Sequence, residues 1–357
     1  MLVHRRSKDN AHIHIECIET NLNTLLFYQK NKNPLGVYCK TMQYPPSIHT
    51  LLYTLLLFIH VGCKPEQSSV IDWSTSPNIN KNHKEDAQRL ELPRLEKNSI
   101  FNCYTTTFEG KETVTFSIEY DKSKRHSKWV TYTIDRSTAQ KNWNRGDWEK
   151  GDPFQPDPLL PKALRIGHAN HRKDQYDRGH LCASEDRVYS KEANAHTFYY
   201  SNISPQLEAF NQRGPWHELE KRIREWGGCE EDTAPIGDTL YITKGGTIRD
   251  GEFYDSRGKH GVIVKKINKM NGIVVPAHYF VALVCRKANA TNGIAFYLKH
   301  KDYGKKYQLA DYAISIDSLE TLTGIDFFCN FPDKIEERFE SRHDPTVWGL
   351  SPTLPQF

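Results

Sequence analysis

The sequence predicts an α+β fold in which helices flank a central, mainly antiparallel sheet. Apolar and polar residues alternate in several segments, and this period of two residues is typical of strands. The connections between these segments are short and turn-like, as at Asn271-Gly272, which favours antiparallel neighbours over parallel strands joined by crossover helices. A hydrophobic content of 38% in 357 residues is enough for a packed core.

The first predicted strands form a hairpin. Residues 114–120 and 129–134 both alternate between apolar and polar side chains, and the connection at 121–128 is polar. Later segments rich in Val, Ile, Tyr and Phe predict four further strands, at residues 239–243, 261–267, 276–284 and 294–298.

Two helices are predicted after the hairpin. One begins at about Pro215, because proline is tolerated at the first helical position and Gly214 before it interrupts any earlier helix. The other covers residues 316–323, where Ser315 can cap the start and Gly324 can end the last turn.

The N-terminal part contains an apolar run typical of an export signal. Residues 51–59 are too few to span a bilayer, which needs about 20, but they suit the apolar core of a secretion signal. Gly62-Cys63 resembles the cleavage and lipidation point of a bacterial lipoprotein signal, and the alternative is a buried strand or a signal anchor. We therefore expect an exported protein, secreted or attached through lipid at Cys63 to a bacterial cell envelope.

These features divide the chain into five predicted parts. A signal should begin a protein, so translation is expected to start at Met42, and residues 1–41 are expected to be an upstream extension. The other parts are a signal peptide with a lipoprotein-like cysteine at 42–63, a polar tether at 64–89, a folded domain at 90–340 and a C-terminal tail at 341–357. Five cysteines follow Cys63, so at least one is unpaired if the others form disulfides, and no connectivity follows.

The most distinctive motif is Asp177-Arg178-Gly179-His180, which joins a cation, a hairpin-forming glycine and a titratable base. Two polar stretches follow, at residues 201–206 and 210–214, and then a helical run at 216–226. In this order the segments predict a strand end, a second strand and a helix around one site.

Residues 176–181, 202–206, 210–212 and 216–220 resemble the DNA/RNA non-specific endonucleases of the ββα-metal, or His-Me finger, class. This family includes the Serratia-type nuclease and mitochondrial endonuclease G. The similarity extends from about Thr115 to about Asp333. It implies a ββα-metal fold, an endonuclease domain at 90–340 and a metal-dependent, sugar-non-specific hydrolysis of phosphodiester bonds in DNA and RNA. The implied cofactor is Mg²⁺, with Mn²⁺ as the other possibility.

The candidate base is His180, because an ordinary imidazole pKa near 6.5 leaves it neutral at physiological pH. The alternative is a core histidine bonded to a backbone carbonyl. The resemblance implies that Asn211 provides the single direct metal bond and that Glu220 orients metal-bound water. Asn211 could instead be a turn or cap residue. Since nine residues at 100° each would put Asn211 and Glu220 on opposite faces of one helix, Asn211 is expected in the turn before Pro215.

Two arginines near the motif have predicted catalytic roles. Arg178 is similar to a family arginine that faces the substrate phosphate. Arg224 lies four residues after Glu220 on the same helix face, where it could orient the carboxylate, meet phosphate or form only a surface ion pair.

A further arginine, upstream of the motif, assists the transition state in this family. Arg145 is the candidate here, although Lys141-Asn142-Trp143 fits the local pattern comparably. Asn202 resembles a second family asparagine close to the site, where we expect it to support the structure.

A formal net charge of +4 permits a polyanionic partner without demanding one, so nucleic-acid binding must come from local clusters such as Lys221 and Arg222. Two other functions remain open: a catalytically silent nucleic-acid-binding lipoprotein, and a phosphodiesterase for small nucleotides. The presence together of a base, a metal ligand and an acidic residue that can orient metal-bound water, namely His180, Asn211 and Glu220, favours the nuclease. The sequence leaves the oligomeric state open.

Overall fold

A computed structural model describes residues 17–21, 24–27, 40–41, 78, 80–83, 85–171, 175–255, 259–264, 272–288 and 290–351. The predicted signal peptide at 42–63, including Cys63, lies outside these residues. The chain divides into two units, residues 1–70 and 71–357. In the first unit, three short strands pair in the order β1 (Cys17–Asn21), β2 (Thr24–Phe27) and β3 (Lys40–Thr41).

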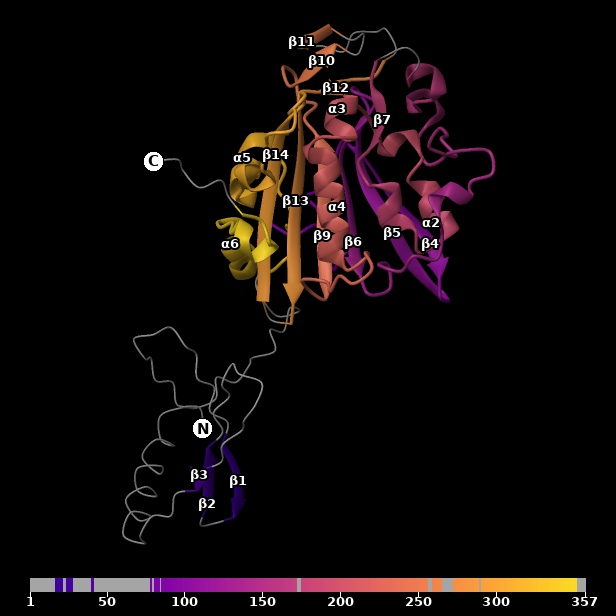
Figure 1. Ribbon diagram of the computed structural model, residues 1–357. Coiled ribbons are helices and arrows are strands. Elements are labelled where there is room, and N and C mark those ends of the chain that lie inside the picture. Colours follow the sequence, from indigo (N-terminus) through magenta and orange to yellow (C-terminus); the bar gives the residue numbers. More distant parts are fainter. Residues whose placement is uncertain are drawn as a thin grey trace. The chain divides into compact units, whose positions relative to one another are not determined.

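The second unit is built on a seven-stranded antiparallel sheet, which confirms the predicted α+β class (Figure 1). From one edge to the other, its strands are β15 (Ala313–Ile314), β14 (Ala290–Lys299), β13 (His278–Lys287), β9 (Thr239–Gly246), β6 (His126–Asp135), β5 (Lys111–Asp121) and β4 (Ile100–Phe108). Two small sheets are separate from it: the pair β7 (Asp177–His180) and β8 (Ile203–Gln206), and the set β10 (Phe253–Asp255), β11 (Lys259–Val264) and β12 (Val275–Pro276).

The predicted hairpin is confirmed, because β5 and β6 pair antiparallel with Ile118 opposite Val130. The edge strand β4 was not among the predicted strands. Its sequence, IFNCYTTTF, ends in a run of threonines that hides the alternation, and it is only partly buried because it has one neighbour.

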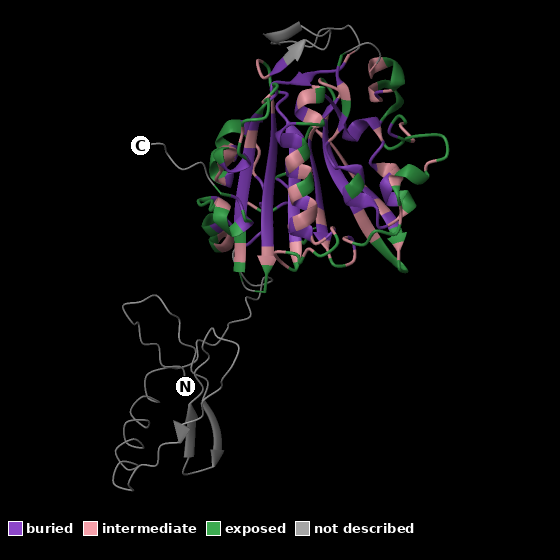
Figure 2. Cartoon of the chain, in the orientation of Figure 1, coloured by how far each residue is buried: buried purple, intermediate pink, exposed green. Residues whose placement is uncertain are grey.

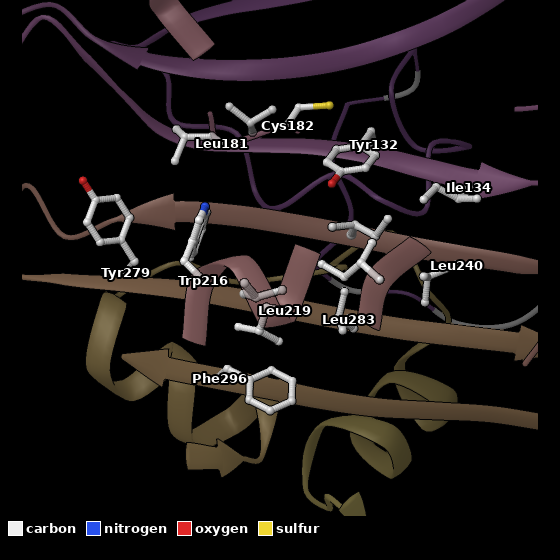
Figure 3. Close-up of a cluster of buried hydrophobic side chains, with 14 of the residues drawn as sticks. Tyr132, Ile134, Leu181, Cys182, Trp216, Leu219, Leu240, Tyr279, Leu283 and Phe296 are labelled. Carbon is white, nitrogen blue, oxygen red and sulfur yellow. The ribbon is translucent and has the colours of Figure 1, made fainter. Parts of the chain in front are cut away.

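Helices cover both faces of the sheet. On one face, α4 (Pro215–Gly227) packs Trp216 and Leu219 against strand side chains that include Tyr132 and Leu283 (Figure 3). Ile223 of the same helix belongs to this buried cluster. The opposite face is covered by α5 (Ile316–Thr323) and α6 (Asp333–Glu340). The middle strands are therefore buried on both sides (Figure 2).

The predicted helix boundaries are confirmed. Proline is the first residue of α4, and Gly228 ends it with a left-handed φ of 71°. In α5, the Ser315 hydroxyl accepts a hydrogen bond from the Ser318 amide, and Gly324 ends the helix with a φ of 69°. Within the described residues the remaining helices are α2 (Lys191–His196) and α3 (Glu208–Asn211), with short 3-10 turns at Arg145–Asp147, Lys162–Leu164, His168–His171, Ser184–Arg187, Tyr200–Asn202, Leu309–Tyr312 and Pro345–Trp348. No helix in the described part of the chain is both long and apolar enough to cross a membrane.

Parts of two segments predicted to flank the domain pack on it. In the predicted tether, the Asn78 side-chain amide donates to the Cys329 carbonyl at 3.0 Å. In the predicted tail, Trp348 is 2% exposed and lies against Trp226, with ring centroids 5.1 Å apart. Composition predicted a tether and a tail because both segments are mostly polar. A few side-chain hydrogen bonds and one buried tryptophan are weak sequence signals of packing on a domain.

The five cysteines between residues 78 and 351 are all free. Cys103 is partly exposed, and the other four, Cys182, Cys229, Cys285 and Cys329, are buried.

Candidate active site

The motif forms a compact β-β-α arrangement against the main sheet. In β7, Asp177 pairs with Gln206 of β8, and His180 pairs with Ile203. The chain then passes through the single turn of α3, which ends at Asn211, and enters α4 at Pro215. As predicted, Asn211 lies in the turn before the long helix, so both it and Glu220 can face the same space.

That space is a cleft of about 700 Å³. Six residues predicted to be functional line it: Arg145, Arg178, His180, Asn211, Glu220 and Arg224. Three others do not: Asn202, Lys221 and Arg222. The structure therefore gathers into one cleft a base, an amide, a carboxylate and three guanidinium groups that are up to 79 positions apart in the sequence (Arg145 to Arg224).

His180 lies against two aromatic rings. Its ring centroid is 5.7 Å from that of Phe154 and 5.1 Å from that of Phe198. Burial, together with the positive charge of Arg145, lowers the pKa of His180 to about 3. Its Nε2 atom is buried and has no hydrogen-bond partner among the described residues. The histidine is therefore neutral at physiological pH, and within the described part of the chain it makes no hydrogen bond to a backbone carbonyl that would mark it as a satisfied core residue.

Gly179 of the motif is required by close packing. A Cβ atom at this position would lie 2.0 Å from Oε1 and 2.4 Å from the side-chain carbonyl carbon of Gln206. Gln206 is completely buried, so its amide has little room to move away. Glycine thus allows β7 and β8 to approach beside the catalytic motif.

We expect Gly179→Ala to destabilise the protein by about 1–3 kcal/mol, the usual cost of overpacking. Thermal unfolding should show the loss, and Gly179→Ala combined with Gln206→Ala should recover part of it. Equal midpoints for the two variants would show that the Gln206 side chain is not the obstacle.

Asp177 was named in the motif but given no role, and the structure shows what it contacts. Its Oδ2 atom accepts hydrogen bonds from Asn211 Nδ2 at 3.0 Å and from Gln212 Nε2 at 2.7 Å. The bond from Asn211 Nδ2 to Asp177 fixes the orientation of the Asn211 amide. Among the described residues, the Oδ1 atom of Asn211 has no hydrogen-bond donor. Sequence alone could not show this pairing, because the partners are 34 positions apart.

Asn202 holds the backbone beside the motif. Its Oδ1 accepts from the Cys182 amide at 2.8 Å, and its Nδ2 donates to the Cys182 carbonyl at 2.9 Å. The side chain is fully buried, so it fixes the backbone that follows His180, at the end of β7, and does not reach the cleft.

The cations of the cleft differ in how far they are neutralised. Arg178 is exposed, and its guanidinium lies 3.9 Å from the centre of the Phe154 ring, with no acidic partner among the described residues. Arg145 is half-buried and donates through Nε and Nη2 to the carboxylate of Asp152, with a third bond to Ser184. The rival upstream residue, Lys141, pairs with Glu230 at 2.7 Å and does not line the cleft.

Beneath the cleft lies a buried group of charges. Lys244 of β9 is fully buried, and its ammonium is 3.8 Å from Glu220 Oε1 and 4.0 Å from Asp186 Oδ2. Burial raises the pKa of Glu220 to about 7, and Lys244 acts in the opposite direction. The sequence prediction missed Lys244 and Asp186, although a lysine directly after an apolar strand segment was a usable signal.

Arg224 belongs to the same group. Its Nη1 lies 3.6 Å from Asp186, and its Nε donates to Glu230 at 2.9 Å. It lines the cleft beside Glu220 while its ion pairs go to other carboxylates. On the outer surface of α4, Lys221 and Arg222 pair with Glu225 at 3.8 and 2.9 Å.

The sheet, the helices and the β7-β8-α4 arrangement of the motif are those of the ββα-metal fold class. Residues 99–334, more than half of the chain, match the model of the DNA/RNA non-specific endonuclease family, and the chain belongs to this family. This confirms the resemblance seen in the sequence.

Curated relatives and a solved structure agree. "Nuclease EXOG, mitochondrial" is 27% identical over 226 residues in Xenopus laevis, covering 62% of this chain and 59% of the relative, and 28% identical over 230 residues in Homo sapiens, covering 63% and 56%. "Endonuclease G, mitochondrial" of Bos taurus is 27% identical over 221 residues, covering 62% and 69%. The fold matches a crystal structure of the EndoG/EndoGI complex with a TM-score of 0.51 at 20% identity, covering 64% of this chain and 87% of that one. The chain thus spans less than two thirds of the length of most of these curated relatives.

These relatives contradict the predicted location. The prediction of an exported protein, secreted or held in a bacterial cell envelope, is wrong, because the relatives are named as mitochondrial. The apolar run at 51–59 is not specific to a lipoprotein signal. The lipid anchor at Cys63 was expected only for an exported bacterial protein, so the reason to expect it no longer holds.

Proposed function

We propose that this protein is a Mg²⁺-dependent endonuclease that hydrolyses DNA and RNA without selecting the sugar or the base. The observation that carries the proposal is that one site contains two complementary groups. They are a neutral, half-enclosed His180 and an Asn211 amide whose nitrogen is already bonded to Asp177. Both line one cleft with Glu220. Family membership supports the same reaction class.

His180 acts as the general base in this proposal. The buried Nε2 leaves Nδ1 as the nitrogen that accepts a proton from the attacking water. Phe154 and Phe198 fix the ring and keep water away from its faces. The low pKa ensures that the imidazole is unprotonated before reaction.

The cleft suits a hard cation. Amide and carboxylate oxygens are the ligands that Mg²⁺ and Mn²⁺ prefer, and the free Oδ1 of Asn211 and the carboxylate of Glu220 are such groups. Asn211 would bind the ion directly, and Glu220 would hold a water of its shell, oriented by Lys244 from below. The ion, when bound, stabilises the negative charge that develops on the phosphate oxygens and the leaving oxygen.

The three arginines of the cleft have separate roles in the proposed reaction. Arg178, which is free of acidic partners among the described residues, contacts the substrate phosphate. Arg145, aligned by Asp152, and Arg224, aligned by Asp186 and Glu230, support the charge of the transition state. Lys221 and Arg222 extend the contact to phosphates beyond the cleft, and Asn202 supports the backbone behind His180.

A plasmid-digestion assay tests the function. The protein should convert supercoiled plasmid and structured RNA to fragments with Mg²⁺ and stop when EDTA is added. Binding without cleavage would support a silent nucleic-acid-binding protein, and hydrolysis of a dinucleotide with plasmid left intact would support a small-nucleotide phosphodiesterase.

We also propose a mitochondrial location in place of export, because the relatives carry that name. Cell fractionation with a tagged protein checks it. Recovery in the culture medium or the cell envelope would contradict it.

Substrate affinity should fall steeply with salt, because binding through phosphates releases condensed counterions. Arg178→Ala should weaken DNA and RNA alike and lower the slope of log affinity against log salt by about one. Alanine at Lys221 and Arg222 should weaken both substrates less, since Glu225 already pairs with these cations. An unchanged slope in Arg178→Ala would remove this arginine from the phosphate contacts.

A further inference from the structure

A second group of acidic residues lies on the face of the sheet opposite the cleft, where α5 and α6 pack together (Figure 1). Asp317 and Glu320 are three positions apart in α5, so their side chains share one face of that helix. Glu340 is the last residue of α6. One oxygen from each carboxylate lies within 4.8 Å of the others. The three groups therefore converge on one point from two helices.

Two buried carboxylates point to a missing positive charge. Glu340 is 8% exposed and its neighbour Glu336 is 5% exposed, and Oε1 of each is buried without a hydrogen-bond partner in the described structure. Between residues 78 and 351, as far as they are described, no lysine or arginine forms an ion pair with these two glutamates, Asp317 or Glu320. An unpaired buried carboxylate is costly.

The position of Glu340 adds to this imbalance. It ends α6, where the unpaired carbonyl groups of the last turn carry the negative end of the helix dipole. A carboxylate there is repelled by its own helix, whereas a cation is attracted by both.

We propose that Asp317, Glu320 and Glu340 form a calcium site that joins α5 to α6. Carboxylate oxygens up to 4.8 Å apart suit Ca²⁺, whose oxygen ligands lie at 2.3–2.6 Å, better than Mg²⁺, which requires about 2.0–2.1 Å. Asp317 is exposed, so water can complete the coordination shell. The ion stabilises the helices that cover one face of the core, and it takes no part in the proposed hydrolysis.

Titration of the full-length chain with calcium chloride tests the site. Asn211→Ala serves as the background, because it removes the proposed metal ligand of the cleft, and EDTA treatment followed by dialysis removes bound metal. Isothermal titration calorimetry should show one Ca²⁺ per chain with a Kd on the order of 10⁻⁴ M, and the thermal midpoint should rise with Ca²⁺ until the site saturates.

In the same background, Glu320→Gln and Glu340→Gln should each weaken Ca²⁺ binding at least about tenfold. The matched control is Glu337→Gln, an exposed glutamate of α6 outside the cluster, which should bind as the background does. Without calcium, Glu340→Gln should unfold at the same temperature as the background or higher, because it removes a buried charge.

Absence of any calcium response in the background would overturn the proposal and would favour protonated carboxyl groups in its place. A calcium response in Glu320→Gln and Glu340→Gln as strong as that of the Asn211→Ala background would also overturn it. If Glu340→Gln fails to fold, Asp317→Asn, at an exposed position, gives the same comparison. None of these results depends on nuclease activity.

Discussion

His180→Ala should lower the rate of phosphodiester hydrolysis by about 10²- to 10⁴-fold, the usual contribution of a positioned general base. Substrate affinity and Mg²⁺ dependence should stay close to those of the unmodified protein, because His180 binds neither phosphate nor metal in the proposed site. Single-turnover rates at saturating substrate measure the loss directly. A folded variant that digests plasmid at a near-normal rate would remove the base from the mechanism.

Misfolding must be excluded as the cause. The His180 ring packs on Phe154 and Phe198, so alanine leaves a gap between two aromatic side chains. His180→Asn is the companion variant, because it keeps a polar side chain there but its amide cannot accept the proton of water. Both variants should be inactive while their thermal midpoints differ, and this result would separate chemistry from packing.

The pH dependence follows from the same residue. An ordinary histidine would give a rate that rises with pH near 6.5. Burial lowers the pKa of His180 to about 3, so the neutral, active form already predominates above about pH 5, and the acid limb of the rate should lie well below 6.5. Between pH 6.5 and 3 the unfolded chain binds a proton that the folded chain excludes, so stability falls as the pH is lowered through this window. A limb near 6.5 that disappears in His180→Asn would show a solvated ring.

Asn211→Ala should raise the Mg²⁺ concentration needed for half-maximal activity by at least about tenfold and lower the maximum rate. The physical reason is that it removes the only direct protein ligand proposed for the ion. A Mg²⁺ titration of the initial rate measures both effects.

Gln212→Ala is the matched control for this change. Gln212 and Asn211 both donate to the same oxygen of Asp177, so each substitution removes one hydrogen bond from that carboxylate, but only Asn211 is proposed to bind metal. The control should shift the Mg²⁺ requirement much less. Equal shifts in the two variants would assign the effect to Asp177 and not to a metal bond.

The sequence predicted those parts of the fold that depend on local pattern. The hairpin of β5 and β6, the start of α4 at Pro215 and both ends of α5 follow from alternation, proline and capping residues that are adjacent in the chain. Strand β4 was not predicted, because an edge strand needs only partial burial and its threonines do not alternate in polarity.

The motif likewise predicted which residues line the cleft, but not how they are held there. The Asp177–Asn211 bond, the Arg145–Asp152 pair and the buried Lys244 are tertiary contacts. Their partners are chosen by how β7, α4 and β9 pack, and no spacing rule in the sequence encodes that choice. The prediction of the location was wrong for a different reason. A short apolar run does not specify the membrane or organelle to which a protein is targeted.

Helix α4 is held by residues that are made long after it. Its Trp226 donates from Nε1 to the Trp348 carbonyl at 2.9 Å, and its apolar face packs on Leu283 of β13 and Phe296 of β14. During synthesis the whole catalytic motif therefore leaves the ribosome before the strands and the final turn that fix this helix. A growing chain has the chemical groups of the site without their support, and the order of translation delays full support of α4 until Trp348 has emerged.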